Sequence, residues 1–255
     1  MDDRHLPPRA PVTPPQDTDV PEHEPASSDE EILGAETAAV VSLLDDEARL
    51  DRIQDELRVG FRSLAHVGRA VSIFGSARTP PEHSEYAQGR EIARRLGERG
   101  FAIITGGGPG VMEAANRGAQ DAGVQSIGLD IELPHEENVN AYVDLPITFH
   151  YFFTRKVMFV RYASAFVVLP GGFGTLDELF EALTLRQTEK IRVFPVILFG
   201  TAYWQGLVDW LRDPMCADGK ISPEDIEQIV VTDDIDEVVE IVCAAEHRRP
   251  RIEAS

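Results

Sequence analysis

The fold is decided by one stretch, which reads Ala165-Phe166-Val167-Val168-Leu169 and continues Pro170-Gly171-Gly172-Phe173-Gly174-Thr175-Leu176-Asp177-Glu178. The apolar run predicts a buried strand, the glycines predict a turn, and residues 179–188 have the spacing of an amphipathic helix. A strand, a glycine turn and a helix in this order aim free backbone N–H groups and the positive end of the helix at one point, where a phosphate can bind. Glu178 lies one turn inside the same helix. The stretch therefore predicts a phosphate cradle beside a carboxylate, which suggests chemistry on a nucleotide.

Strand-like and helix-like segments alternate on both sides of this stretch. The predicted strands are residues 71–75, 101–105, 126–129, 166–169, 195–199 and 229–231, with a weaker one at 141–144. The predicted helices are residues 86–99, 110–122, 154–163, 176–188, 203–211 and 235–245. Short β-rich runs that are each followed by a helix predict an α/β fold, a Rossmann-like doubly wound parallel sheet with helices on both faces. Ligands of such folds bind at the carboxyl ends of the strands, near a topological switch point.

The composition divides the chain into four parts. Residues 1–31 hold seven prolines and nine acidic residues against two arginines, which predicts a disordered acidic tail because little apolar surface can be buried there. Residues 36–66 have apolar side chains at helical spacing and predict an extra N-terminal helical segment, for packing or for an oligomer contact. Residues 68–245 form the predicted Rossmann-like domain, and 246–255 a C-terminal tail.

Charge and cysteine content narrow the classes of partner. The formal net charge of -20 over 255 residues opposes binding to nucleic acid or to an anionic membrane surface. It still allows a small anionic ligand at a local cluster of N–H groups and arginines. No apolar run is long enough to span a bilayer, and the two cysteines match no metal or redox spacing. We therefore expect a cytoplasmic protein that binds neither nucleic acid nor membranes.

Two further glycine turns follow predicted strands. The first, Gly75-Ser76-Ala77-Arg78, taken alone is best interpreted as a plain turn with room for the backbone. The second, at residues 105–113, has four glycines in five positions, including Gly107 and Gly108, which is more than a turn needs. It matches neither the dinucleotide fingerprint nor a Walker loop, so no nicotinamide cofactor is inferred. Glu113 is either a ligand contact or a first-turn glutamate favoured by the helix dipole. All three turns are expected to converge at one sheet edge.

A basic pair, Arg155-Lys156, precedes the glycine motif. Thr154 is predicted as the helix N-cap, which places both cations in a first turn where the dipole disfavours them, so that an anion such as a phosphate or Glu178 is expected nearby. The aromatic run at 149–153 either packs in the core or supplies a wall for a base. His150 is either an acid–base group or, more commonly, a structural histidine.

Arg155-Lys156 and the stretch from Pro170 to Glu178 resemble the signature of the LOG ("lonely guy") family of cytokinin riboside 5′-monophosphate phosphoribohydrolases, formerly labelled "possible lysine decarboxylase". The triple-glycine segment 105–119 also resembles bacterial members, and the resemblance covers residues 68–245. It implies a Rossmann-like enzyme that cleaves a nucleoside 5′-monophosphate into a free base and ribose 5-phosphate. It also implies a homodimer or a larger homo-oligomer with the site near the subunit interface.

The resemblance further implies roles for individual residues. Arg155 and Glu178 would be the catalytic pair, with Arg155 keeping Glu178 ionised, and neither a metal nor an organic cofactor would be needed. The implied phosphate contacts are Gly172, Gly174 and Thr175, with Thr184 and Glu136 as weaker substrate contacts. The turns and the basic pair add the binding candidates Gly75, Ser76, Gly107, Gly108, Lys156 and Gly171.

Three other functions compete with this hypothesis. A decarboxylase would need a lysine for pyridoxal phosphate, and Lys156, Lys190 and Lys220 are in no recognisable cofactor context. A non-catalytic nucleotide-binding or sensing protein would use the same fold, because fold does not establish activity. A DNA-binding relative is opposed by the net charge of -20.

Overall fold

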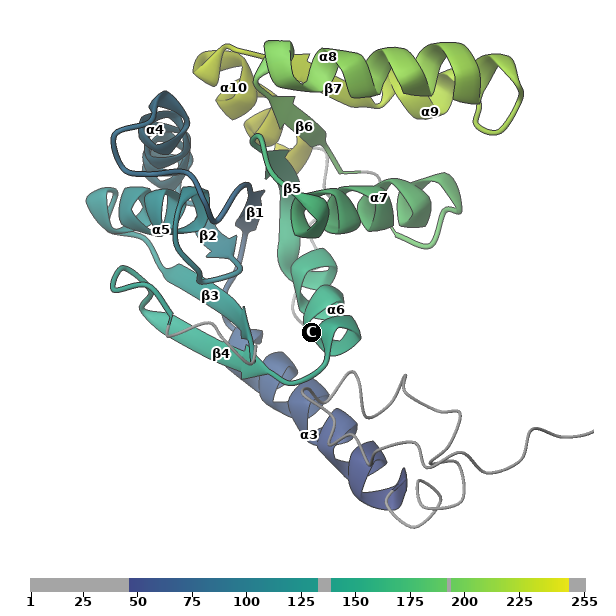
Figure 1. Cartoon of the computed structure of the whole chain (residues 1–255). Coiled ribbons are helices and arrows are strands. Elements are labelled where there is room, and N and C mark those ends of the chain that lie inside the picture. Colours follow the sequence, from purple (N-terminus) through teal and green to yellow (C-terminus); the bar gives the residue numbers. More distant parts are fainter. Residues whose placement is uncertain (1–45, 133–138, 192–193, 248–255) are drawn as a thin grey trace, which may run out of the picture.

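A sheet of seven parallel strands forms the centre of the computed structural model, which describes residues 46–132, 139–191 and 194–247 (Figure 1). The strand order is β4-β3-β2-β1-β5-β6-β7, and each neighbouring pair is parallel. The strands are β1 (Ala70–Phe74), β2 (Ala102–Thr105), β3 (Ser126–Ile131), β4 (Leu145–Phe149), β5 (Ala163–Val168), β6 (Val196–Phe199) and β7 (Ile229–Thr232). The doubly wound parallel fold predicted from the sequence is confirmed.

Helices cover both faces of the sheet (Figure 1). One face packs against α4 (Ser84–Glu98), α5 (Val111–Asp121) and α10 (Ile235–His247). The other packs against α3 (Asp46–Leu64), α6 (Phe152–Tyr162), α7 (Phe173–Gln187) and α8 (Thr201–Trp210). A π-helical segment, η1 (Leu211–Cys216), and a short helix, α9 (Pro223–Glu227), follow α8. No helix within the described ranges is both long enough and apolar enough to cross a membrane.

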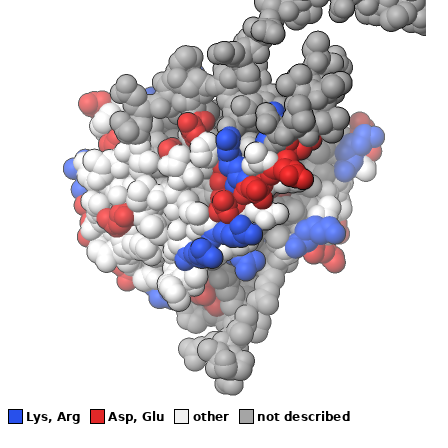
Figure 2. Space-filling view, turned by 90° about the horizontal axis from the view of Figure 1, so that it is seen from below, with Lys and Arg blue, Asp and Glu red and all other residues white. Residues whose placement is uncertain are grey.

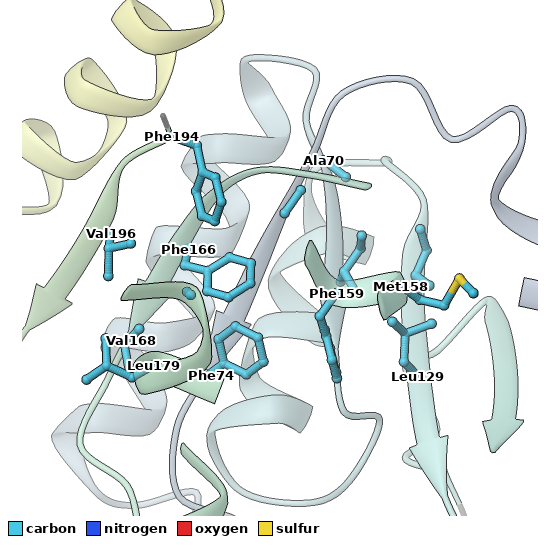
Figure 3. Packing of buried hydrophobic residues seen from close by; sticks show 14 of the residues in the cluster. Ala70, Phe74, Leu129, Met158, Phe159, Phe166, Val168, Leu179, Phe194 and Val196 are labelled. Atoms are coloured by element: carbon cyan, nitrogen blue, oxygen red, sulfur yellow. The ribbon is translucent and has the colours of Figure 1, made fainter. Parts of the chain in front are cut away.

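Alternation along the central strands divides the core into two layers. Phe166 and Val168 of β5 face the cluster under α6 and α7, whereas Ala165 and Val167 face the cluster under α4 and α10. The first layer is aromatic: the ring of Phe74 lies 4.9 Å from that of Phe166, which in turn lies 5.0 Å from that of Phe194 (Figure 3). Burial of one such side chain contributes about 1.5–3 kcal/mol, so this layer holds β1 and β5 firmly side by side.

The topological switch point lies between these two strands. From β1 the chain adds β2, β3 and β4 on one side, and then returns to add β5, β6 and β7 on the other. The connections leaving β1 and β5 therefore diverge at their carboxyl ends, which is where open α/β sheets bind ligands.

The structure corrects the prediction of a strand at residues 141–144. The edge strand is β4, Leu145–Phe149, and residues 141–144 precede it. The side chain of Asn140 accepts a hydrogen bond from the backbone N–H of Tyr142 (3.1 Å), which bends the chain locally. Pro146 is tolerated inside β4 because an edge strand has one unpaired side.

Other boundaries also differ from the expectations. The predicted helical segment at 36–66 contains α3, while residues 36–45 lie outside the described residues, as do the predicted tail 1–31 and residues 248–255. Helix α10 extends to His247, two residues beyond its expected end, and α9 was not anticipated.

Candidate active site

Three glycine turns meet at the carboxyl edge of the sheet, as the sequence predicted. The backbone N–H of Ser76, after β1, donates to the carbonyl of Pro170, after β5 (2.9 Å). The carbonyl of Ser76 accepts from the N–H of Val111, at the start of α5 (3.0 Å). The first turn, whose isolated pattern favoured a plain connection, therefore links the other two.

Some of the glycines are required by the packing of the protein itself. Gly110 has φ +69°, and a Cβ atom there would lie 2.3 Å from the carbonyl oxygen of Ser76. A Cβ on Gly171 would lie 2.1 Å from the hydroxyl oxygen of Thr175. A Cβ on Gly75 would lie 2.6 Å from the side chain of Val111. These glycines allow the turns to approach one another.

Gly172 and Gly174 are different because open space lies beside them. Apart from the adjacent residues and the backbone of the helix itself, no heavy atom of the described residues comes within 4 Å of a Cβ built on either one. Gly172 is the N-cap of α7, and the first N–H groups of a helix have no acceptor within the helix. Thr175 has a hydroxyl of the kind that caps helices, but it is the third residue of the helix. The start of α7 is thus an open arrangement of backbone donors that can accommodate an anion.

Glu178 lies in the next turn of α7 and is almost completely buried, with 3% of its surface exposed. Among the residues that the structure describes, neither of its carboxylate oxygens has a hydrogen-bond partner. Burial raises its pKa to about 7, against the opposing charges of Lys156 and Arg155. The expectation that Arg155 keeps this carboxylate fully ionised is therefore wrong, because the loss of hydration outweighs the attraction. A carboxyl with such a pKa can change protonation state near neutral pH.

Lys156 reaches from α6 to the same part of α7. Its ammonium nitrogen lies 2.8 Å from Asp177 Oδ2, 2.7 Å from Glu181 Oε2 and 3.7 Å from Glu178 Oε1. Burial lowers the pKa of Lys156, but hydrogen bonds to Asp177 and Glu181 raise it above its ordinary value overall. Figure 2 shows one face of the molecule on which acidic and basic side chains lie beside one another. Lys156 therefore forms ion pairs with carboxylates of α7 and does not extend toward a ligand.

Arg155 leaves α6 on the side of the glycine turns. Its guanidinium carbon lies 5.1 Å from the ring centre of Phe152 and 5.6 Å from that of Phe159. A Cβ built on Gly106 would lie 4.0 Å from its Nη1 atom, so the guanidinium borders the second glycine turn. Arg155 and Glu178 therefore come from adjacent elements to the same edge of the sheet.

The start of α6 differs from the predicted one. Its N-cap is Tyr151, and Thr154 is its third residue, because Phe152 and Phe153 already have helical geometry. The aromatic run divides its roles: Tyr151 and the preceding Phe149 are buried in the core, whereas Phe152 and Phe153 are partly exposed. Core packing is therefore confirmed for Phe149 and Tyr151, and a wall for a base stays a prediction for Phe152 and Phe153.

Two asparagines that the sequence analysis missed support the second glycine turn. Asn140 Nδ2 donates to the carbonyls of Gly107 (2.9 Å) and Gly108 (3.0 Å), and lies 2.9 Å from Asn116 Oδ1. Asn116 is fully buried on α5 and also contacts the hydroxyl of Thr105 (2.7 Å). Asn116 could have been found from the sequence as a polar residue on an otherwise apolar helix face, whereas no sequence pattern marks Asn140.

The remaining predicted positions lie apart from the cradle or have other partners. Thr184 is exposed and donates to the carbonyl of Phe180 (2.7 Å), and nine residues after Thr175 it lies roughly 13 Å further along α7. Glu136 lies outside the described residues. Glu113, the other weighed ligand contact, accepts a hydrogen bond from the hydroxyl of Tyr86 (2.7 Å). Within the described ranges, no three His, Cys, Asp or Glu side chains form a group that could hold a metal ion.

Comparisons with known proteins identify the family of the chain. The model of the family described as "Possible lysine decarboxylase" matches residues 112–242. A relative in Mycobacterium tuberculosis, named cytokinin riboside 5′-monophosphate phosphoribohydrolase, is 31% identical over 162 residues, which is 61% of this chain and 84% of the relative. A relative of the same name in Oryza sativa, designated LOG, is 35% identical over 99 residues, 38% of this chain and 41% of that one.

Two further matches extend the comparison. The pyrimidine/purine nucleotide 5′-monophosphate nucleosidase of Escherichia coli is 34% identical over 46% of this chain, a region that spans 28% of that enzyme. The molybdenum cofactor carrier protein of Chlamydomonas reinhardtii shares the fold, with a TM-score of 0.55 and 20% identity over 71% of this chain and 99% of the other. With the family signature, the sheet topology and the relatives in agreement, the chain belongs to the LOG family, the family described as "Possible lysine decarboxylase".

Proposed function

We propose that the protein hydrolyses the N-glycosidic bond of a nucleoside 5′-monophosphate and releases the free base and ribose 5-phosphate. The observation that carries this proposal is the buried carboxylate of Glu178, which has no hydrogen-bond partner among the described residues and lies one turn inside a helix with an open glycine start. Binding of a phosphate alone needs no such carboxylate, and burying one without hydrogen bonds costs stability.

The first step is binding through the phosphate. The open side of Gly172 and Gly174 lets the phosphate approach the N–H groups that begin α7, and Thr175 adds a hydroxyl nearby. Because the ribose is then held by its phosphate, binding energy becomes orientation at the sugar C1′ atom.

The second step is cleavage. The bond between C1′ and the base nitrogen breaks through an oxocarbenium-like state, and its electron pair leaves with the base, which takes up a proton from solvent. A water oxygen bonds to C1′ and that water loses a proton. The ionised form of Glu178 stabilises the positive charge on the sugar or takes the proton from the attacking water. Arg155 stabilises the negative charge that develops on the departing base and orients Glu178. These steps require neither a metal nor an organic cofactor.

The names of the relatives define the substrates to test. They include cytokinin riboside 5′-monophosphates and pyrimidine or purine 5′-monophosphates. We propose a purine or a cytokinin nucleotide, with the partly exposed Phe152 and Phe153 as a wall for the base.

The decarboxylase alternative is disfavoured by the surroundings of Lys156. A pyridoxal phosphate lysine must act as a neutral amine, whereas two close carboxylates raise the pKa of this one.

We also propose a homodimer or larger homo-oligomer in the cytoplasm. Phe173, at the start of α7, is 91% exposed, and Phe153 and Val157 on α6 are partly exposed, so the rim of the site offers apolar surface to a second copy. Within the described ranges neither Cys216 nor Cys243 forms a disulfide bond, as a reducing compartment favours. Light scattering and cell fractionation test these two points.

The decisive experiment measures free base and ribose 5-phosphate released from AMP, N6-isopentenyl-AMP and UMP, with EDTA present. We expect release by the wild type and none by Glu178→Gln, and the ratio of rates identifies the preferred base. If nucleotide binds to the wild type but no base is released from any substrate, the protein is a non-catalytic nucleotide-binding or sensing module. Equal release by the variant would refute the proposed role of the carboxylate.

A further inference from the structure

Helix α3, outside the part of the chain that matches the family, places a buried carboxylate at the start of α6. Glu56 Oε1 accepts a hydrogen bond from the backbone N–H of His150 (3.0 Å) and lies 2.9 Å from the ring nitrogen Nδ1 of the same residue. Glu56 Oε2 lies 2.7 Å from the hydroxyl of Thr154. The Glu56 side chain is only 8% exposed, so these contacts are shielded from water.

The contact between α3 and α6 continues beyond this carboxylate. A Cβ built on Gly60 would lie 2.7 Å from the end of the Met158 side chain, so the helices approach closely there. One turn further along α6, the hydroxyl of Tyr162 donates to the carbonyl of Phe61 (3.3 Å). Thr154, Met158 and Tyr162 are spaced four residues apart and share one face of α6. Helix α3 therefore supports α6 along its length.

The start of α6 needs this support for an electrostatic reason. In the described part of the chain its N-cap, Tyr151, provides no side-chain cap, and the helix has no acidic residue in its first turn. Arg155 and Lys156 follow as its fourth and fifth residues, where the positive end of the helix dipole repels them. A carboxylate at this end stabilises the positive end of the helix dipole and offsets the charge of the two cations.

We propose that Glu56 is a positioning residue for the site: its carboxylate, supplied by α3, holds the first turn of α6 and thereby sets the positions of Arg155 and Lys156. The expected effect on kcat rests on the proposed function, whereas the expected effect on the first turn of α6 does not. Met158 and Thr154 face α3, whereas Arg155 borders the second glycine turn and Lys156 reaches α7. A shift of α6 consequently moves both cations relative to Glu178.

The test compares Glu56→Ala and Glu56→Gln with Asp51→Asn, which removes the same charge from an exposed position of α3. We expect Glu56→Ala to lower kcat by about 10- to 100-fold, as misplacement of catalytic groups does. KM should change by less than about threefold, because the phosphate cradle of α7 is untouched. Glu56→Gln should recover part of kcat, since its amide oxygen can still accept one hydrogen bond, and Asp51→Asn should behave as wild type.

A structural readout makes the test independent of turnover. Hydrogen exchange at the amides of residues 152–158 should speed up in both Glu56 variants and stay unchanged in Asp51→Asn. If Glu56→Ala fails to fold, Glu56→Gln provides the same comparison. An unchanged kcat with unchanged exchange in α6 would overturn the inference, as would lower thermal stability with an unchanged kcat. If the wild type itself releases no base, the proposed function fails. Faster hydrogen exchange in α6 of the Glu56 variants then still supports the positioning role, and unchanged exchange refutes it.

Discussion

Substitution of Glu178 by glutamine should remove a pH-dependent loss of stability from the protein. Burial raises the pKa of this carboxyl from the ordinary value of 4.5 to about 7. Each pH unit is worth about 1.4 kcal/mol, so the ionised carboxylate costs about 3 kcal/mol in the native state. Glutamine has nearly the same shape and carries no charge at any pH.

The sign of the effect follows from the protonation states. Below pH 4.5 the carboxyl is protonated in both the native and the unfolded chain, and the free energy of unfolding is unaffected. Between pH 4.5 and about 7 the unfolded chain releases the proton while the native protein retains it, so wild-type stability falls as pH rises. Above pH 7 both states are ionised, and the full cost persists.

Urea unfolding of both proteins from pH 5 to pH 8 measures this difference. Relative to wild type, Glu178→Gln should gain about 2–3 kcal/mol over this range, or roughly 5–10 °C in Tm at pH 8. The buried glutamine amide lowers the free energy of unfolding by about 1–3 kcal/mol at every pH, so it does not change the slope of stability against pH. The matched control is Glu240→Gln, at an exposed position of α10. Parallel pH curves for Glu178→Gln and wild type would refute the argument.

The other predictions concern the cations and the glycine turns. Removing the ammonium group with Lys156→Met should move the acidic limb of the kcat–pH profile to higher pH, because Lys156 lowers the pKa of the buried carboxyl; an unmoved limb contradicts this. Arg155→Ala should lower kcat by about 100-fold or more, and Arg155→Lys should recover little because the planar guanidinium stacks on aromatic rings; full activity in either removes it from the site. Gly110→Ala should lose more than about 3 kcal/mol in urea unfolding, whereas Gly123→Ala, which has a similar positive φ but open space, should lose only about 1–2 kcal/mol; equal losses would show that backbone strain alone matters. Gly172→Ala should unfold like wild type yet bind AMP at least about tenfold more weakly by calorimetry, because its methyl group enters the space open to the phosphate; unchanged affinity moves the phosphate elsewhere.

Local patterns in the chain were enough to predict most strands and the longer helices in order, but they missed α9 and placed the edge strand at 141–144 instead of Leu145–Phe149. In β5 the run from Ala165 to Val168 is apolar and a glycine turn follows shortly after it, and burial on both sides makes that signal strong. Boundaries were less certain: Thr154 and Thr175 have the chemistry of N-caps, yet both are third residues of their helices. Helix starts are decided by contacts across the fold, such as Glu56 with Thr154, as well as by local propensity.

The sequence by itself determined the parallel α/β architecture and the convergence of three glycine turns at one edge, because periodicity and chain order dictate them. Only the tertiary structure decided the protonation of Glu178, the enclosure of Lys156 by carboxylates and the support of α6 by α3. Those properties depend on burial and on side chains brought together from distant segments. Burial and the distances between side chains of distant segments are set only when the chain folds, whereas the hydrophobic pattern is already present in the sequence.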